Sequence, residues 1–276
     1  MKQAKPPSAG QWRNPVKEKL ARGESVFGAV ITVNNVEIAA QTAALGFDFL
    51  WLEMEHAPLT LETVRNIVLA TRGLQAIPFA RPPVNRLWTA KQVLDAGVLG
   101  VMFPFTSSPE LARQAVAACR YPTAGLRGSG ADLARFRWTE PDSYYDFADQ
   151  NVLVVTIIED ALGLENADAI AATPGVDVVF IGTSDLSFAL GLRGEPDHPR
   201  LRKAVAHIAA AAKRHGKVLG RPAGTLKQVR QFEAQGFRFF HTRTEVEFMA
   251  AGARLLLDPL GKPPQFGALS ATPGAL

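Results

Sequence analysis

The stretch that decides the fold runs from residue 153 to residue 187 and reads LVVTIIEDALGLENADAIAATPGVDVVFIGTSDLS. Two apolar runs, Leu153–Ile158 and Val176–Ile181, have the composition of buried strands, and they flank a segment of helical length. Continuous apolar strands joined by a helix are typical of a parallel sheet that helices cover. The stretch therefore predicts a strand–helix–strand unit whose two strands end at the same edge of the sheet.

The same alternation of strand and helix extends through the chain on both sides of this unit. Further strands are predicted at Ser25–Thr32, Phe47–Met54, Ala76–Arg81, Gly100–Pro104, Lys217–Pro222 and Phe237–Thr242. Helices are predicted at Pro15–Arg22, Val36–Ala44, Thr60–Arg72, Arg86–Ala96, Ser108–Cys119, Arg200–His215, Leu226–Gln235 and Val246–Leu257. This order favours an α/β fold of the (β/α)8 TIM-barrel type over an open sheet. No G-x-G-x-x-G follows the first strand, which argues against a dinucleotide-binding sheet.

Length and composition are those of one packed globular domain spanning residues 1–276. Residues 1 to about 14 are polar and are expected to form a loosely held arm, and about 258–276 an extended tail. The net charge is +4 with scattered basic residues, so nucleic acid is not an expected partner. The one cysteine, Cys119, excludes an intramolecular disulfide and fits a reducing cytoplasm. No apolar run is long enough to span a membrane.

Two acids follow the strands of the opening unit. Glu159 closes the first strand and Asp185 comes shortly after the second, so both are expected at the carboxyl-terminal edge where TIM barrels place their chemistry. Paired carboxylates with water and a chelating substrate suit Mg²⁺, Mn²⁺ or a similar divalent cation. Each acid alone is also a good cap for the following helix. Since the two acids lie on adjacent strands, a metal site is the favoured interpretation.

Other polar residues follow the strands at the same edge. His56, after Glu53 and Glu55, is a candidate general base or a holder of a water that acts as one, or else a solvent-facing loop residue. One of the two glutamates is expected to orient it. Arg81 is placed to hold an enolate or carboxylate oxygen, or to pair with a strand-end acid such as Glu53. Backbone N–H groups of Gly182, Thr183 and Ser184 precede a helix and are candidates for binding a substrate carboxylate.

Two common kinds of covalent catalysis are disfavoured. A Schiff-base aldolase needs a lysine at a strand's carboxyl end, whereas Lys217 begins a strand and Lys91 lies within a helix. A serine hydrolase of the α/β type lacks its G-x-S-x-G turn.

The segments that carry these residues resemble the HpcH/HpaI family of class II, metal-dependent pyruvate aldolases. The resemblance covers roughly residues 25–255 in the family's order, in FDFLWLEMEHAP (47–58), ARPP (80–83), VLDAGVLGVMFP (93–104), AACRYPTAGLRGSG (117–130), IEDALGLENADAI (158–170) and PGVDVVFIGTSDLSFALGL (174–192). It implies an enzyme that reversibly cleaves a 4-hydroxy-2-oxo acid to pyruvate and an aldehyde through a pyruvate enolate. It also implies a homohexamer, a trimer of dimers, in which the last helix packs on a neighbouring subunit.

The resemblance assigns roles to individual residues. It implies that Glu159 and Asp185 hold the cation (Mg²⁺, Mn²⁺ or Co²⁺), which pyruvate chelates through its carboxylate and keto oxygens. His56, with the acid at Glu53, would support the water that transfers the proton, and Arg81 would stabilise the enolate. The backbone at 182–184 would receive the carboxylate.

The chain also departs from the family's pattern. Glu53 stands where an aspartate is usual, Ile157 where a glutamine is common, and GTSDLS replaces a GPADLS-type turn. The last two strands carry GRPAG (220–224) and FFHTRTE (239–245) where small or apolar residues are frequent. The hypothesis is that Arg221, His241 or Arg243 reshapes the acceptor pocket for an anionic aldehyde or ketone. Surface or interface ion pairing is the alternative for them.

Two other functions compete with aldol cleavage. Oxaloacetate decarboxylation, or another carbon–carbon bond reaction of the same enolate, would use an identical site. A barrel that has lost catalysis and serves as a scaffold is the third reading, which the presence of Glu159, Asp185, His56 and Arg81 disfavours.

Overall fold

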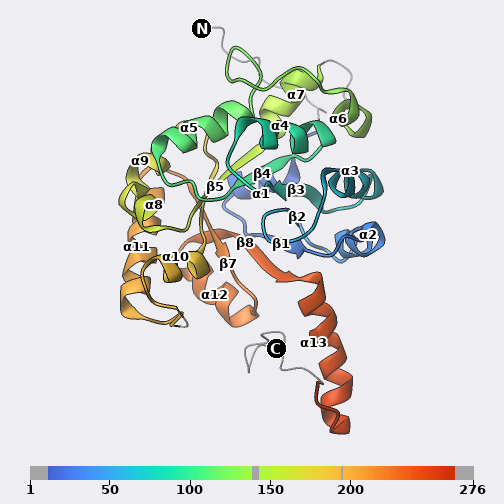
Figure 1. Cartoon of the computed structure of the whole chain (residues 1–276), viewed down its shortest axis with the longest axis vertical. Coiled ribbons are helices and arrows are strands. Elements are labelled where there is room, and N and C mark those ends of the chain that lie inside the picture. The colour runs from blue at the N-terminus through green and yellow to red at the C-terminus, as the bar shows by residue number, and fades with distance from the viewer. Residues whose placement is uncertain (1–11, 139–142, 194, 265–276) are drawn as a thin grey trace.

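The computed structural model describes residues 12–138, 143–193 and 195–264. Eight parallel strands form a closed barrel in chain order, with β8 beside β1, and helices surround it (Figure 1). The strands are β1 Val26–Ile31, β2 Phe49–Glu53, β3 Ile77–Arg81, β4 Gly100–Phe103, β5 Leu153–Ile158, β6 Val178–Ile181, β7 Val218–Pro222 and β8 Phe237–Thr244. The predicted (β/α)8 TIM barrel is confirmed, because each predicted strand overlaps one of these.

The helices of the outer layer begin where the sequence offers a cap. Side chains of Asn35, Thr60, Ser108 and Thr225 each accept a hydrogen bond from the first turn of the following helix. The described helices are α1 Pro15–Ala21, α2 Val36–Ala43, α3 Leu61–Ala70, α4 Leu87–Ala96, α5 Pro109–Ala118, α6 Asp132–Arg137, α7 Tyr144–Asn151, α8 Ala161–Glu165, α9 Ala167–Ala171, α10 Thr183–Ala189, α11 Pro199–Arg214, α12 Leu226–Ala234 and α13 Glu245–Leu257. None is long and apolar enough to cross a membrane, over the part of the chain that the structure describes.

The structure differs from the predicted elements in three places. The helical run after Glu159 is two short helices, α8 and α9, that meet at Asn166. The segment 121–150, which interrupts the alternation, contains the additional helices α6 and α7. The tail begins with a short 3-10 helix, Asp258–Leu260, so its first residues are not extended, and residues 265–276 lie outside the described residues.

The expected loose arm is wrong for its last residues. Asn14 is fully buried, caps α1, and donates two hydrogen bonds to Asn151 at the end of α7. The Trp12 ring lies 5.0 Å from the Trp138 ring and 5.6 Å from the Phe147 ring, measured between centroids. The chain is therefore anchored from Trp12 onward, and residues 1–11 lie outside the described residues.

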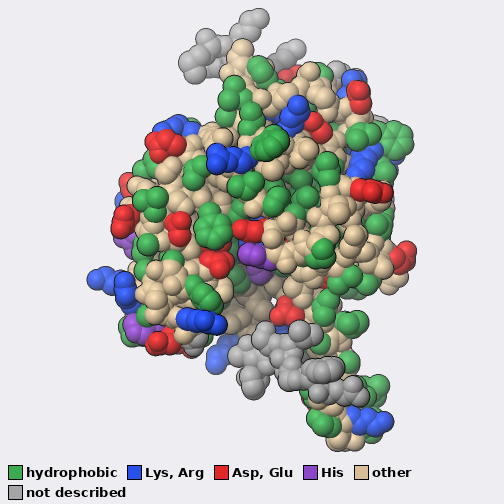
Figure 2. Space-filling model, viewed as in Figure 1, with side chains coloured by type: hydrophobic (Ala, Val, Ile, Leu, Met, Phe, Trp, Pro, Cys, Tyr) green, Lys and Arg blue, Asp and Glu red, His purple; other side chains and the backbone are tan. Residues whose placement is uncertain are grey.

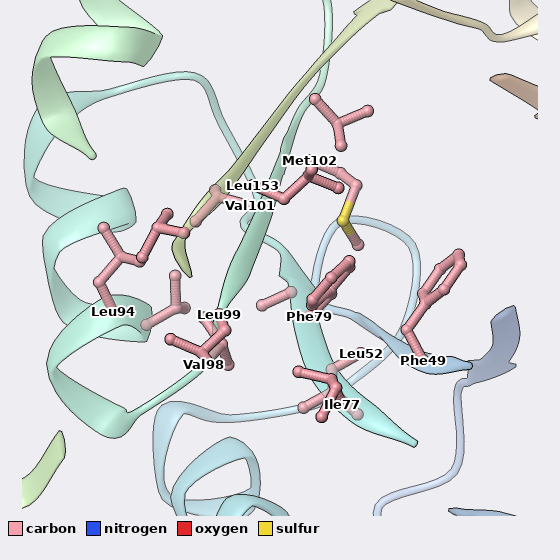
Figure 3. Packing of buried hydrophobic residues seen from close by; sticks show 14 of the residues in the cluster. Phe49, Leu52, Ile77, Phe79, Leu94, Val98, Leu99, Val101, Met102 and Leu153 are labelled. Carbon is pink, nitrogen blue, oxygen red and sulfur yellow. The ribbon is translucent and has the colours of Figure 1, made fainter. Parts of the chain in front are cut away.

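Aromatic rings fill the interior of the barrel. The Phe49 ring stacks on Phe79 and on Phe239, with centroids 5.1 and 4.6 Å away, and Met102 lies beside Phe79 (Figure 3). Glycine on a neighbouring strand makes the space for a ring, because a Cβ at Gly28 would lie 2.1 Å from Phe49 and one at Gly100 2.5 Å from Phe79. Side chains at alternate positions of each strand thus form a solid floor below the site.

Candidate metal centre and active site

Polar side chains gather at the carboxyl-terminal ends of the strands, where the barrel opens. β2 ends in Glu53, β3 in Arg81, and Glu159 directly follows β5. Acidic and histidine side chains are grouped near the centre of the face that Figure 2 shows. This is the end of the barrel at which the sequence predicts the site.

Glu159 is held in one orientation by the loop after β4. Only 2% of the residue is exposed, and its Oε1 accepts a 2.7 Å hydrogen bond from the backbone N–H of Phe105. Phe105 adopts a positive φ of 43°, a conformation that is unfavourable for a bulky residue and that recurs at functional sites. On its other side Glu159 packs over Gly182, where an added Cβ would lie 2.5 Å from Oε2. The loop and the glycine together fix the carboxylate.

Asp185 lies in the first turn of α10, immediately after β6. Its carboxylate accepts no hydrogen bond from the described residues, and neither does Oε2 of Glu159. The two acids are close enough that the charge on Asp185 raises the pKa of Glu159. No set of three or more His, Cys, Asp or Glu residues is arranged for a metal among the residues described. The donor set is therefore two carboxylates with open oxygens, which fits a divalent cation that completes its shell with water and substrate.

The electrostatics of the site favour such a cation. Burial first, and then the negative charges of Glu55 and Asp185, raise the pKa of Glu159 to about 7, against the opposing hydrogen bond from Phe105. The pKa of Glu55 is also raised, chiefly by burial. Acids that are crowded and desolvated in this way gain from a positive ion between them.

Arg81 is bound to Glu53 through two of its nitrogens. Both Nε and Nη2 of Arg81 lie 2.6 Å from Oε2 of Glu53, which is 3% exposed. Glu53 also accepts from Nε1 of Trp51 and from the backbone N–H groups of Glu55 and His56. Burial raises the pKa of Glu53, but Arg81 and these hydrogen bonds outweigh it and the pKa is lowered. Glu53 is therefore an anion that fixes Arg81.

The His56 ring is paired with Glu55 instead of Glu53. Its Nε2 lies 3.6 Å from Oε2 of Glu55, and 58% of the His56 side chain is exposed. Glu53 bonds only the backbone of His56, so the expected dyad of His56 with the acid at 53 is replaced by contact with Glu55. Oε2 of Glu55 also lies 3.0 Å from Nη1 of Arg81, as an ion pair outside hydrogen-bonding geometry. Glu55 thus joins the histidine to the arginine.

The three residues of the last strands lie in different surroundings. Arg221 faces outward, with its guanidinium carbon 3.4 Å from the centre of the Phe232 ring, so the prediction that it lines the acceptor pocket is wrong for this residue. The reason is the alternation of β7, in which Gly220 takes the inward position against Phe180. Arg243 donates from Nε to the carbonyl of Gly224 in the loop after β7. His241 lies beside Trp51 and Phe180 at the barrel mouth.

Sequence reasoning did not identify two residues that shape the site. Trp51 stacks beneath Arg81, with the guanidinium carbon 5.5 Å from its ring, and donates to Glu53. Phe105 supplies the N–H that holds Glu159. The signal for Trp51 was its position two residues before Glu53, which in a strand puts both side chains on one face. Nothing local marks Phe105, because its φ is a property of the folded loop.

Comparison with known proteins places the chain in a family. The model of the HpcH/HpaI aldolase/citrate lyase family matches residues 27–250. The chain is similar to 5-keto-4-deoxy-D-glucarate aldolases from Escherichia fergusonii, with 36% identity over 90% of this chain and 97% of the relative, and Salmonella paratyphi A, with 38% identity over the same shares. A crystal structure of a family protein from Burkholderia cenocepacia superposes with a TM-score of 0.83 at 31% identity, covering 90% of this chain and all of the other. The chain belongs to the HpcH/HpaI aldolase/citrate lyase family.

Proposed function

We propose that the chain is a metal-dependent aldolase that reversibly cleaves a 4-hydroxy-2-oxo acid to pyruvate and an aldehyde. The observation that carries the proposal is the pair of open carboxylates, Glu159 and Asp185, next to an arginine that is fixed by a buried acid. The relatives named as aldolases of 5-keto-4-deoxy-D-glucarate support a carbon–carbon lyase acting on a hydroxylated 2-oxo acid. The constellation suits chemistry in which negative charge develops on an oxygen between a cation and a guanidinium.

Glu159 and Asp185 would hold the divalent ion, which we propose to be Mg²⁺, Mn²⁺ or Co²⁺. Both acids have oxygens that accept no hydrogen bond from the described residues and can therefore bind the ion. Gly182 has no Cβ, so Oε2 of Glu159 can keep its position beside it. When bound, the ion supplies a Lewis acid for the keto oxygen of the 2-oxo acid.

Arg81 would stabilise the enolate oxygen as the carbon–carbon bond breaks. Its Nε and Nη2 are occupied by Glu53, and its Nη1 faces Glu55, so the side chain enters the reaction already oriented. The carboxylate of the substrate would lie at the backbone of Gly182, Thr183 and Ser184, whose helix has no side-chain cap. Orientation before the reaction reduces the reorganisation that charge development would otherwise need.

His56 would support proton transfer through a water at the solvent side of the site. Its exposure places it where water reaches it, and Glu55 lies 3.6 Å from Nε2 as the acid that orients the ring. Proton transfer is required twice in the cycle. The 4-hydroxyl loses its proton as the bond breaks, and the enolate carbon gains one to give pyruvate.

The test is pyruvate release from a panel of 4-hydroxy-2-oxo acids that includes 5-keto-4-deoxy-D-glucarate, with oxaloacetate measured beside it. Each assay is run after EDTA treatment and again after addition of Mg²⁺, Mn²⁺ or Co²⁺. We expect chelation to abolish pyruvate release and metal to restore it, with at least one hydroxy acid cleaved faster than oxaloacetate. Cleavage of oxaloacetate alone would make the protein a decarboxylase, and activity that survives chelation would refute the metal assignment.

We further propose that the active form is a homohexamer, built as a trimer of dimers through α13. This helix projects away from the barrel in Figure 1, and Glu245 is its one buried residue. Its apolar side chains are exposed, at 69% for Met249, 63% for Leu255 and 67% for Leu256. An apolar surface of this kind is typical of an interface between subunits. Light scattering after size-exclusion chromatography should give six chains for the wild type and fewer for a Leu255→Glu/Leu256→Glu variant.

The domain organisation and the compartment of the protein are the last two properties that we propose. We propose that residues 1–276 form one domain around this barrel and that the enzyme acts in the cytoplasm on small molecules. The compartment is proposed from the cysteine content, because the chain has one cysteine, Cys119, and so no intramolecular disulfide. Burial raises the pKa of the Cys119 thiol to about 12, so the thiolate that reacts with oxidants is scarce.

A further inference from the structure

His241 is an inward-facing histidine at the barrel mouth, on β8, three strands around the barrel from Arg81 on β3. In β8 it is paired with Pro222 of β7 and with Gly28 of β1. Phe239, two residues earlier on the same face of the strand, stacks on Phe49 in the barrel floor. His241 therefore lies one layer above that floor, at the level of the site.

Two aromatic rings hold the imidazole in place. It stacks on Phe180, with centroids 5.6 Å apart and planes 15° apart, and meets Trp51 edge to face at 5.1 Å and 68°. Phe180 and Trp51 are both almost fully buried. Offset stacking and edge-to-face contact are the favoured geometries for aromatic pairs, so the ring has little freedom to turn.

The hydrogen bonding of the ring fixes its tautomer. Nδ1 lies 2.9 Å from the carbonyl oxygen of Thr242. A carbonyl only accepts, so Nδ1 carries the proton, and in the neutral ring Nε2 is an acceptor. Burial against these rings lowers the pKa of His241 and so favours the neutral form of the ring. No described residue donates a hydrogen bond to Nε2, and His241 is only half-buried.

Trp51 connects this imidazole to the proposed enolate site. One indole contacts the His241 ring, carries the Arg81 guanidinium 5.5 Å from its ring centre, and donates from Nε1 to Glu53. Only the Trp51 indole therefore separates a group bound beside Arg81 from the His241 ring. The half of the substrate that leaves as the aldehyde must extend from Arg81 and the two carboxylates into the remaining space of the mouth.

We infer that His241 determines acceptor specificity by accepting, through Nε2, a hydrogen bond from a hydroxyl group of the aldehyde half of the substrate. The inference rests on the proposed function. A neutral acceptor attracts a hydroxyl and gives no attraction to a carboxylate, so the group recognised here is a hydroxyl. Arg221 does not supply a cation to this pocket, because its side chain lies against Phe232 outside the barrel.

The experiment compares two aldehydes that differ by one hydroxyl group. Glycolaldehyde and acetaldehyde are condensed with pyruvate in the presence of Mg²⁺, and kcat/KM for each aldehyde is measured by chromatography of the 4-hydroxy-2-oxo acid formed. His241→Phe keeps the stacking ring and removes the acceptor. We expect the glycolaldehyde-to-acetaldehyde ratio of kcat/KM to fall about threefold to tenfold, the effect of one hydrogen bond between neutral groups.

Two further variants make the result specific. His241→Gln restores an acceptor near the position of Nε2, and we expect it to recover most of the ratio. Arg221→Met, on the neighbouring strand but facing outward, should keep the wild-type ratio. Thermal unfolding of each variant checks that the ratio is measured on folded protein.

The outcomes separate this inference from the proposed function. If the wild type condenses pyruvate with aldehydes and His241→Phe changes both aldehydes in the same proportion, the specificity role of His241 is overturned while the aldolase remains. If Gln fails to recover a ratio that Phe has lowered, the hydrogen bond is not the cause and the inference is likewise overturned. Absence of condensation in the wild type with any aldehyde refutes the aldolase itself.

Discussion

The two halves of the barrel mouth differ in the interactions that hold their side chains in place. On the side of β2, β3, β5 and β6, charged groups are fixed by other charged groups and by backbone N–H groups: Glu53 holds Arg81, and Phe105 holds Glu159. On the side of β7, β8 and β1, glycine and aromatic residues dominate, and His241 is fixed by contacts with two rings and by one hydrogen bond to the backbone carbonyl of Thr242. The half of the mouth that we propose to bind pyruvate is therefore constrained by electrostatics, whereas the half that we propose to meet the aldehyde is constrained mainly by shape.

The largest effect should come from the metal pair. Glu159→Gln keeps the size of the side chain but removes its charge, and we expect pyruvate formation to fall on the order of 10³-fold, the scale of a lost metal-ligand interaction in catalysis. Mn²⁺ binding followed by electron paramagnetic resonance should weaken in parallel. Asp168→Asn is the matched control, since Asp168 pairs with Arg214 on the exposed surface. Equal losses in both variants would contradict the assignment.

Removing Arg81 should affect both activity and stability. In Arg81→Leu the carboxylate of Glu53 stays buried without its partner, and an uncompensated buried charge costs about 3–5 kcal/mol of the free energy of unfolding. Urea denaturation measures this cost. The double variant Arg81→Leu/Glu53→Gln should regain part of the stability but none of the activity. Recovery of activity in the double variant would show that Arg81 acts only as the partner of Glu53.

Gly182→Ala tests the space that Glu159 occupies. The added methyl would lie 2.5 Å from Oε2, so the carboxylate must leave the position that it occupies now. We expect Mn²⁺ affinity to fall about 10-fold to 100-fold, as for groups that orient metal ligands. Gly252→Ala in α13 is the control, because its Cβ meets nothing within 4 Å. Unchanged affinity in Gly182→Ala would place the ion elsewhere.

Acid should remove the stability that Glu53 provides. Its pKa in the folded protein is lowered from the ordinary value of 4.5, so the stabilisation is complete above that value and is lost as the pH falls through the lowered pKa. The difference in unfolding free energy between wild type and Glu53→Gln should therefore be constant at neutral pH and shrink in acid. A difference that does not change with pH would mean that packing, and not charge, makes Glu53 stabilising.

The smallest effect is expected from Arg221, which lies on β7 but faces outward from the barrel. In the wild type the Arg221 guanidinium stacks on Phe232, while its buried Nε has no hydrogen-bond partner. Arg221→Met removes both the stacking and the unpaired donor. The lost stacking is worth about 0.5–2 kcal/mol and relief of the unpaired donor offsets it, so stability should change by less than about 1 kcal/mol. Kinetics with every aldehyde should be unaltered. A changed aldehyde preference would show that Arg221 reaches the pocket.

The sequence was informative where strands and their ends decide the structure. Apolar runs predicted all eight strands, and parallel pairing then brought Glu159, Asp185 and Arg81 to one edge. It was uninformative where contacts are remote: nothing near Asn14 announces its hydrogen bonds to Asn151. It also could not reveal which way Arg221 points, because Val218–Pro222 lacks a clear alternation of polar and apolar residues and the β7–β8 register shifts at Leu219 and Gly220.

We propose that the charged half of the mouth forms the pyruvate enolate without help from the other half. The most direct measurement is deuterium incorporation at the methyl group of pyruvate in D₂O, followed by proton NMR with Mg²⁺ and without any aldehyde. We expect exchange in the wild type that stops on addition of EDTA, returns with excess Mg²⁺, and is lost in Glu159→Gln. Exchange that persists with EDTA or in Glu159→Gln would contradict it.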